Sequence, residues 1–255
     1  MPRPALRAGR PRQEKLMRVA GLPAVQALFA TAPDRVERLF FSGELRRQLV
    51  DFCGVLAWAR KPYRQVGNEE LARVAGTVLH GGVVALARPR PVRIFDVSEA
   101  TRWAKDGKLL LLLDGIGNPH NLGAIARTAA FFGLPRIVLS DNPAQALPSD
   151  ASYRVAEGGL DRLEVYKSAG FVHDIEALRR SYFIVGASAE GGQAVAQLAK
   201  ADKPLALVLG NEERGFPPAT ARACDALVTI AGAGAIQSLN VAATAAVLVY
   251  ALVGQ

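Results

Sequence analysis

Apolar and polar positions divide this chain into two parts that differ in their spacing. Between residues 16 and 89, short apolar segments of helical and strand spacing alternate, which predicts a small α/β domain. Helices are expected at 21–30, 43–59 and 69–75, and strands at 36–41, 63–66 and 83–87. The segment 90–106 replaces this pattern with prolines and charges, so it is predicted to be a linker.

From residue 107 to residue 255 the pattern changes to continuous apolar runs separated by helical segments. The first run reads Lys-Leu-Leu-Leu-Leu-Leu-Asp over 108–114, which is typical of a parallel strand buried on both faces. Further strands are expected at 136–140, 182–187, 205–210 and 226–230, and helices at 122–132, 173–180, 193–199, 217–223 and 241–253. This alternation predicts an α/β fold with a mostly parallel sheet and helices on both faces.

Composition narrows the class of protein. Half of the 255 residues are apolar, which suits well-packed cores. No apolar run reaches the length of a membrane span, and the start of the chain lacks the apolar stretch of a secretory signal. Cys53 and Cys224 have neither metal-ligand spacing nor companion histidines. We therefore expect a cytoplasmic protein with reduced cysteines, no metal and no membrane association.

The positive charge lies almost entirely in the first part of the chain. Residues 1–95 hold 17 Lys and Arg against 7 Asp and Glu, whereas residues 96–255 hold 14 against 16. Residues 1–15 combine prolines with arginines and are predicted to be a disordered basic arm. Because the guanidinium group suits phosphate oxygens, this distribution predicts a nucleic-acid contact surface. An arginine-rich composition with a solvated tail is the alternative.

Three polar loops follow predicted strands of the second part. The first runs from Asp114 into the next helix, the second spans 210–217, and the third spans 230–240. Ligands bind such sheets at the carboxyl ends of the strands, so these loops are expected to form one site. Their candidate residues are Asn121, Arg127, Gly210, Asn211, Glu212, Ile230, Ser238, Leu239 and Asn240.

Local rules give a first interpretation of three of these residues. Ser238 is predicted to cap the last helix, and Asn240 is predicted to be a buried amide that needs a partner. Arg127, expected in the second turn of its helix, opposes the helix dipole there and is expected to hold an anion or a carboxylate. Asn118 and Asn121 are both candidate caps of that helix.

Several common site types are absent from the sequence. Neither a Gly-x-Gly-x-x-Gly nor a P-loop motif follows a strand, and there is no Gly-x-Ser-x-Gly elbow and no zinc-spaced histidine pair. A site made of Asn, Arg, Glu, Ser and backbone amides suits a reaction whose reagent arrives activated. Methyl transfer from a sulfonium is such a reaction, because alignment and desolvation supply much of its catalysis.

The three loops resemble the SpoU (TrmH-type) branch of the SPOUT RNA 2'-O-ribose methyltransferases. The segment 121–129, Asn-Leu-Gly-Ala-Ile-Ala-Arg-Thr-Ala, is similar to the first motif of that family. Residues 210–215 are similar to the second motif and residues 238–240 to the third. Residues 16–89 resemble the small L30e-like substrate-binding domain of several members that act on ribosomal RNA.

The resemblance implies a trefoil knot, S-adenosyl-L-methionine as cofactor, structured RNA as substrate and a homodimer with active sites near the subunit interface. It also implies roles for the candidate residues. Gly210, Asn211, Ile230 and Leu239 would contact the cofactor, whereas Arg127, Asn121, Glu212, Ser238 and Asn240 would serve the reaction. Glu212 would brace the second loop or bind Arg127.

Three alternatives remain at the level of sequence. A knotted RNA-binding or ribosome-assembly factor without turnover would carry the same fold. Methylation of a base is disfavoured by Arg127 and the 238–240 segment, which the resemblance assigns to the ribose branch. The L30e-like domain favours ribosomal RNA over transfer RNA, and the target nucleotide is open.

Overall fold

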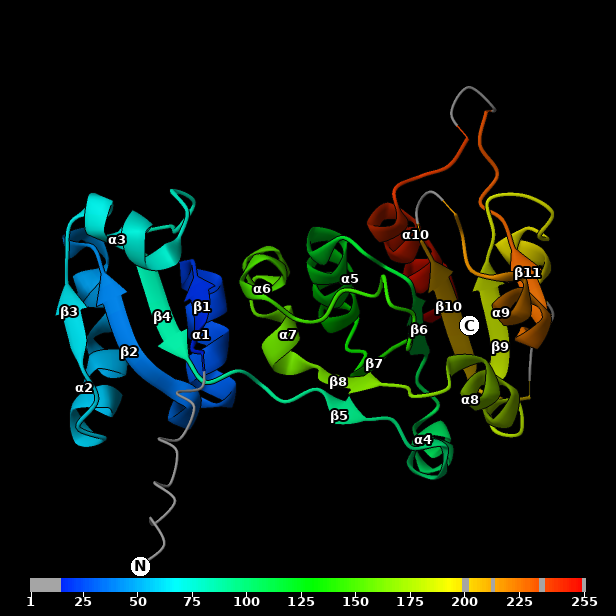
Figure 1. Cartoon of the computed structure of the whole chain (residues 1–255), viewed down its shortest axis with the longest axis horizontal. Helices are drawn as coiled ribbons and strands as arrows, with labels where there is room; N and C mark the ends of the chain where they lie inside the picture. Colours follow the sequence, from blue (N-terminus) through cyan, green and yellow to red (C-terminus); the bar gives the residue numbers. More distant parts are fainter. Residues whose placement is uncertain (1–14, 199–201, 212–213, 234–236, 254–255) are drawn as a thin grey trace, which may run out of the picture.

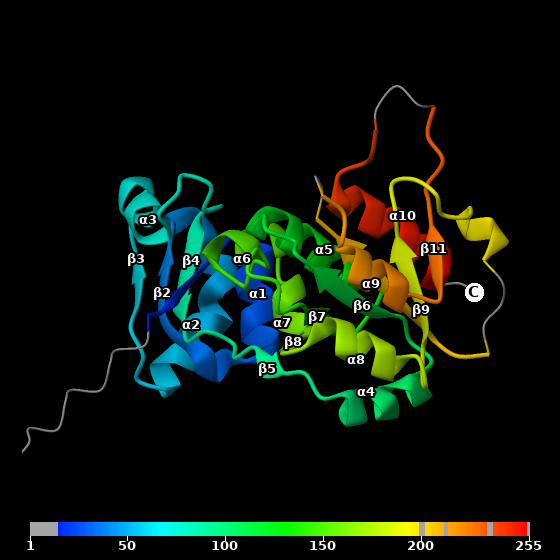
Figure 2. The same ribbon diagram turned by 45° about the vertical axis from the view of Figure 1, so that its right-hand side comes forward.

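The computed structural model describes residues 15–198, 202–211, 214–233 and 237–253. Within these residues the chain forms a four-stranded and a seven-stranded sheet, which occupy opposite ends of the molecule (Figure 1). Figure 2 shows that helices of both parts lie between the two sheets. Nearly all of the predicted basic arm, residues 1–14, lies outside the described residues.

The small N-terminal domain is built on a mixed sheet. Its strand order is β1-β4-β2-β3, in which β4 runs antiparallel to both β1 and β2, and β3 runs parallel to β2. The strands are β1 (Met17–Ala20), β2 (Val36–Phe41), β3 (Tyr63–Gln65) and β4 (Val83–Ala87). The helices are α1 (Leu22–Thr31), α2 (Val50–Trp58) and α3 (Asn68–Ala75), with 3₁₀ turns at Pro33–Arg35 and Gly43–Leu49.

The larger sheet is parallel throughout its described pairings. Its strand order is β11-β9-β10-β6-β7-β8-β5, and this confirms the predicted α/β fold with a mostly parallel sheet. The strands are β5 (Arg93–Ile94), β6 (Leu110–Asp114), β7 (Arg136–Leu139), β8 (Glu164–Lys167), β9 (Phe183–Ala187), β10 (Leu205–Gly210) and β11 (Ala226–Val228).

Helices cover both faces of this sheet. Alternate residues of a strand point to opposite faces, so Leu111 and Leu113 join one core cluster and Leu110 and Leu112 join another. One face carries α5 (Pro119–Phe131), α6 (Asp150–Ala156), α7 (Gly159–Arg162) and α10 (Val241–Val253). The other carries α4 (Val97–Trp103), α8 (Phe171–Leu178) and α9 (Pro218–Ala223).

Some elements differ from the sequence predictions. Within the predicted linker, β5 pairs with β8 and α4 begins at an Asp96 cap, whose carboxylate accepts a hydrogen bond from the Ser98 N–H at 2.8 Å. The predicted helix at 193–199 is only a 3₁₀ turn over Val195–Gln197. Another 3₁₀ turn, η3 (Ala104–Asp106), follows α4. Strands β1 and β8 and helices α6 and α7 were not predicted.

Helix α7 and the preceding α6 connect the two parts of the molecule, because they contact α1 and β1 of the N-terminal domain. Across this junction Arg35 Nη1 and Asp161 Oδ1 are 2.8 Å apart, and the Asp161 side chain is fully buried. A second ion pair at the junction joins Arg18 to Asp150 at 3.6 Å. These contacts fix the N-terminal domain against the face of the large sheet that carries α5.

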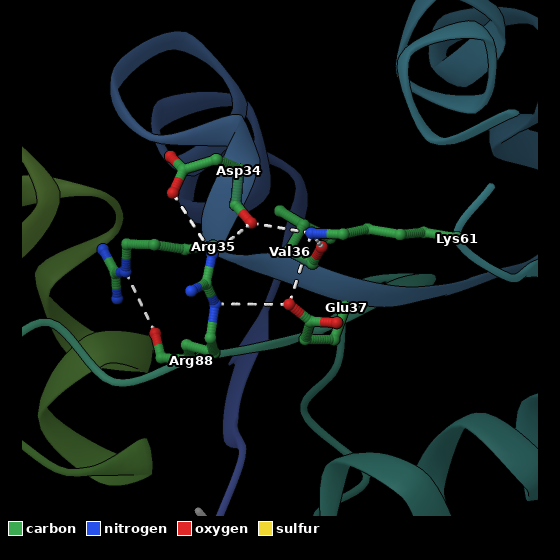
Figure 3. Close-up of polar contacts among 6 residues, drawn as sticks. All are labelled: Asp34, Arg35, Val36, Glu37, Lys61 and Arg88. Atoms are coloured by element: carbon green, nitrogen blue, oxygen red, sulfur yellow. Dashed lines mark hydrogen bonds and ion pairs between the residues drawn. The ribbon is translucent and has the colours of Figure 1, made fainter. Parts of the chain in front are cut away.

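A polar network supports Arg35 from the side of the N-terminal domain (Figure 3). Arg35 Nε donates to the backbone carbonyl of Arg88 at 3.0 Å, and Arg88 in turn pairs with Asp34 and Glu37. Lys61 donates to the carbonyl of Asp34 and contacts Glu37 at 3.2 Å. The junction residue Arg35 is therefore anchored at the point where the chain leaves β4.

Among the described residues there is no helix with the length and apolar character needed to cross a membrane. The trefoil knot implied by the family resemblance stays a prediction.

Candidate functional site

A cavity of about 920 Å³ opens beside the carboxyl ends of β9, β10 and β11. Its position agrees with the rule that ligands of parallel sheets bind at these strand ends. Five predicted site residues line it, namely Gly210, Asn211, Ile230, Ser238 and Leu239. The structure therefore brings the second and third polar loops together around one space.

The second loop is a tight reversal of the chain. Backbone hydrogen bonds of 2.9 Å join Asn211 and Gly215 in both directions. A Cβ on Gly210 would lie 2.5 Å from the backbone nitrogen of Phe216, closer than real Cβ contacts come. Gly210 is thus required because the returning chain at Gly215 and Phe216 passes directly over it.

The Asn211 side chain connects this loop to the first one. Its amide nitrogen donates to the Gly115 carbonyl at 3.1 Å, and its oxygen accepts from the Arg214 N–H at 3.2 Å. Asn211 therefore holds the ends of β6 and β10 together. The predicted site residue Glu212 lies outside the described residues.

The walls of the cavity combine apolar and polar groups. Leu209, Val228 and Leu248 provide apolar surface, whereas Ser188 and Glu190 provide a hydroxyl and a carboxylate. Such a mixed lining suits a ligand with a flat apolar part and polar hydroxyl or charged ends. Sequence reasoning missed Ser188 and Glu190, although their position directly after a predicted strand was a usable signal.

The third loop ends in a capped helix, but the cap differs from the predicted one. The Asn240 side-chain oxygen accepts a hydrogen bond from the Ala242 N–H at 2.9 Å, so Asn240 rather than Ser238 caps α10. Asn240 is also exposed, so the prediction that its amide is buried is wrong. Its amide nitrogen donates to the Asn121 side-chain oxygen at 3.2 Å and thereby joins the third loop to α5.

Arg127 lies on the same helix as Asn121. It is the ninth of the 13 residues of α5, in the third turn rather than the second, and Asn118 caps this helix by accepting from the His120 N–H at 2.9 Å. The expectation of a carboxylate partner is met by Glu157, whose Oε1 lies 2.9 Å from Arg127 Nη1. Arg127 is not among the residues that line the cavity.

Helix α5 is held by unusually close contacts. A Cβ on Gly123 would lie 2.4 Å from the Ser152 carbonyl oxygen of α6. A Cβ on Gly159 would lie 2.9 Å from the Cα of Arg127. Both glycines are therefore needed for backbone to meet backbone, and the positions of Asn121 and Arg127 are fixed by α6 and α7.

Asp114, at the end of β6, is a further residue that sequence reasoning did not single out. Its side chain is buried and accepts a hydrogen bond from the Thr220 hydroxyl at 2.7 Å. This bond ties α9, which contributes Pro218 and Ala221 to the cavity, to the central strand. Asp114 thus shapes the cavity without lining it.

Burial makes both cysteines poor nucleophiles. Burial raises the pKa of Cys224 to about 12, so this thiol stays protonated and poorly nucleophilic at neutral pH. Burial also raises the pKa of Cys53. Within the described residues, His, Cys, Asp and Glu side chains form no group of three or more that could hold a metal ion.

Comparison with known families gives two matches that together cover most of the chain. Residues 108–250 match the model of the SpoU rRNA methylase family. Residues 18–92 match the model of the RNA 2'-O ribose methyltransferase substrate-binding domain. The first match includes all three loops described above, and the second covers the four-stranded sheet.

Relatives and solved structures agree with these matches. An uncharacterized tRNA/rRNA methyltransferase, YfiF of Escherichia coli O157:H7, is 33% identical over 91% of this chain, which spans 66% of YfiF. The 23S rRNA (guanosine-2'-O-)-methyltransferase RlmB of Bordetella pertussis is 30% identical, over 93% of this chain and 96% of RlmB. The SpoU methyltransferase AviRb of Streptomyces viridochromogenes, solved with AdoMet, has the same fold, with a TM-score of 0.74, 24% identity and coverage of 94% and 90%.

Proposed function

Because the chain belongs to the SpoU rRNA methylase family, we propose that it transfers a methyl group from S-adenosylmethionine to a ribose 2'-hydroxyl of ribosomal RNA. The observation that carries this proposal is the cavity where the second and third family loops meet. The RlmB relative, which the chain matches over nearly its whole length, is named for this reaction on 23S rRNA.

The cavity fits S-adenosylmethionine in size and chemistry. Its volume of about 920 Å³ is within the range of pockets that hold ligands of this kind. We propose that Gly210, Asn211, Ile230 and Leu239 contact the cofactor and that the Glu190 carboxylate accepts hydrogen bonds from its ribose. When bound, the cofactor supplies an electrophilic methyl carbon on a sulfonium sulfur.

Arg127 is the residue that we place at the 2'-hydroxyl. Its guanidinium cannot act as a base, because it does not lose its proton in proteins. We propose that it orients the hydroxyl oxygen and stabilises the negative charge that develops there, while the proton leaves through phosphate or water. Asn121 and Asn240 hold the start of α5 against the third loop. We propose that Ser238 adds a ligand contact at the cavity. The prediction that Glu212 braces the second loop or binds Arg127 concerns a residue outside the described part of the chain.

The N-terminal domain is proposed to grip the RNA. It matches a substrate-binding family model, and the first 95 residues hold 17 basic against 7 acidic side chains. Contacts of Lys and Arg with phosphates release counterions, so binding should weaken steeply with salt. We propose a substrate-binding domain at 16–89 and a catalytic domain at 107–255, with the predicted linker at 90–106 packed on the catalytic domain through β5 and α4.

We also propose a homodimer in the cytoplasm that pairs through α5 and α10. Helix α10 carries no charged residue, and a helix that is apolar on all sides is normally buried. Yet Tyr250 of α10 is 74% exposed and Phe131 of α5 is 83% exposed. Phe132 joins the two, with its ring centroid 6.3 Å from that of Tyr250. A second copy would cover this face and bring its α5 near the first copy's site.

The proposal is tested with the purified full chain. Calorimetry should detect S-adenosylmethionine binding. Ribosomal RNA from a strain lacking the gene, incubated with the chain and S-adenosylmethionine, should gain a 2'-O-methyl group at one nucleotide. Arg127→Ala should reduce methyl transfer by at least about 100-fold, as loss of a group that stabilises developing charge does, while RNA affinity stays within a few-fold. Arg102→Ala, an exposed arginine on the opposite face of the sheet, is the matched control.

Two results would contradict this function. A protein that binds ribosomal RNA but neither S-adenosylmethionine nor any methyl donor would be a non-catalytic assembly factor. Alkaline hydrolysis of the RNA distinguishes the two acceptors, because a methylated 2'-oxygen blocks cleavage at its nucleotide. A methyl group found on a base of a normally cleaved nucleotide would exclude the 2'-hydroxyl as acceptor.

A further inference from the structure

The Arg127 side chain has one partner within the described part of the chain, the carboxylate of Glu157. Arg127 Nη1 and Glu157 Oε1 are 2.9 Å apart, and the two side chains are 57% and 44% exposed. Ion pairs that are this accessible to water contribute little to folding stability. The presence of Glu157 therefore needs an explanation other than stability.

The backbone of Glu157 has an unfavourable conformation. Its φ of +45° and ψ of 45° place it in the left-handed region, where glycine and asparagine are preferred and a long side chain is disfavoured. Such conformations persist only where the surroundings impose them, and they gather at functional sites. A glycine at this position would relieve the backbone, but it would leave Arg127 without its carboxylate.

The two residues after Glu157 show what imposes this conformation. A Cβ on Gly158 would lie 2.3 Å from the Cβ of Ala27 in α1, so the turn presses against the N-terminal domain. A Cβ on Gly159 would lie 2.8 Å from the Ala126 carbonyl oxygen in α5. The turn at 157–159 is therefore wedged between the helix of the substrate-binding domain and the helix that carries Arg127.

We infer that Glu157 is a positioning residue, which holds the Arg127 guanidinium by one edge and leaves its remaining N–H groups directed to the RNA. This inference rests on the proposed role of Arg127. The backbone that carries the carboxylate is fixed by close packing at Gly158 and Gly159 rather than being part of a long flexible loop. A rigid support of this kind is what preorganisation of a charged group requires. Because α1 forms one wall of the turn, docking of the substrate-binding domain is linked to the geometry of Arg127.

The test compares Glu157→Gly, Glu157→Gln and the control Glu176→Ala, an exposed glutamate on α8. Single-turnover rates at saturating RNA and S-adenosylmethionine, the KM for RNA and the thermal midpoint are measured for each. Glu157→Gly should lower the rate by about tenfold or more, because a misplaced group loses alignment, with KM within twofold. Its Tm should equal or exceed that of the wild type, since glycine adopts this φ freely.

Glu157→Gln should keep a rate within about threefold of the wild type, because its amide oxygen can take the place of the carboxylate oxygen that lies 2.9 Å from Arg127 Nη1 and can accept from the guanidinium. A purely structural role would lower Tm in Glu157→Gly and leave the rate of the folded fraction unchanged, which would overturn the inference. A rate that rises in Glu157→Gly would also overturn it, because Glu157 would then restrain Arg127 rather than position it.

An Arg127→Ala background separates the inference from the function on which it rests. If Arg127→Ala is inactive and Glu157→Gly has the wild-type rate, the positioning role fails and the proposed function stands. If Arg127→Ala itself methylates at the wild-type rate, the role assigned to Arg127 fails. If Glu157 acts only through Arg127, adding Glu157→Gly to Arg127→Ala should not lower the methyl-transfer rate any further.

Discussion

The amide nitrogen of Asn240 donates a hydrogen bond to the side-chain oxygen of Asn121 across 119 positions of sequence, at 3.2 Å. The same Asn240 side chain caps α10 through its oxygen, which accepts from the Ala242 N–H. One amide therefore performs two tasks: it starts the last helix and ties that helix to α5. The two tasks can be separated by substitution, because serine can cap but is too short to reach Asn121.

Asn240→Ala should remove both tasks, and the lost cap alone should lower the free energy of unfolding by about 1 kcal/mol. Asn240→Ser should keep nearly all of the stability because its hydroxyl replaces the cap. Both variants should bind S-adenosylmethionine several-fold more weakly, since the third loop loses its tie to α5. Thermal melts and calorimetry measure the two effects, and unchanged cofactor affinity in Asn240→Ser would show that the Asn121 bond is not needed at the cavity.

Gly210→Ala should abolish cofactor binding, because its Cβ would lie 2.5 Å from the backbone of Gly215 and Phe216. A clash with backbone cannot be relieved by a side-chain rotation, so the whole second loop must shift. Gly232→Ala is the matched control in the third loop, where a Cβ would meet nothing within 4 Å. Calorimetric titration should show binding in the control and none in Gly210→Ala, and equal affinities would place the cofactor away from the second loop.

The sequence predicted the central strands of the large sheet well, because a strand buried on both faces needs an uninterrupted apolar run such as 108–114. It did not predict β8, whose four residues Glu164–Lys167 have charged ends and read as a loop. Strand β5 is only two residues long and gains its conformation by pairing with β8. Short strands at or next to a sheet edge depend on their neighbours, so local pattern does not reveal them.

Within the candidate site, too, some residues could be predicted from the sequence and others could not. Loops at strand ends were identifiable because polar residues and glycines directly follow apolar runs, and Gly210, Ile230 and Leu239 do line one cavity. The choice between Ser238 and Asn240 as cap was wrong because both residue types cap helices equally well. Glu157 was missed because the packing of α6 and α7 against α5 brings it to Arg127. A contact between residues this far apart in the chain cannot be identified from local sequence.

The domain junction makes a prediction about stability. Asp161→Asn should lower the free energy of unfolding by about 3–5 kcal/mol, because it leaves the buried Arg35 cation without its counter-charge. Replacing both partners, as in Arg35→Met with Asp161→Leu, should restore much of this loss, since no buried charge remains. Urea unfolding measures both, and additive losses in the double variant would show that the two side chains act independently.

The same pair gives a pH dependence. Burial raises the pKa of Asp161, and the charge of Arg35 opposes that rise. A carboxyl whose pKa is raised in the folded state binds its proton more tightly there than in the unfolded chain. Its contribution to the free energy of unfolding is therefore fully present below its ordinary pKa and is lost as pH rises through the raised pKa. Arg35→Met removes the opposing charge, so its deficit relative to the wild type should be larger at pH 7 than at pH 5. A deficit that grows toward acid pH would contradict this assignment.

The exposed face of α5 and α10 makes a prediction about assembly. Tyr250→Glu places a charge at the centre of the proposed interface and should weaken the dimer by at least about 30-fold, the effect of losing an interface hot spot. Ile94→Glu, which changes an 82% exposed apolar residue on the edge strand β5, should leave the dimer intact. Light scattering across a concentration series distinguishes the two, and a monomeric wild type would exclude the dimer.

The bond between Asn121 and Asn240 also has a consequence for the order in which the protein becomes active during its synthesis. The substrate-binding sheet ends at residue 87, whereas the residues that line the cavity lie between Ala187 and Leu248. At about 5–20 residues per second, translation reaches Asn240 roughly 6–24 s after Asn121. On the proposed function, the substrate-binding sheet is therefore complete well before the cofactor cavity, and methylation begins only once α10 has emerged and joined the site.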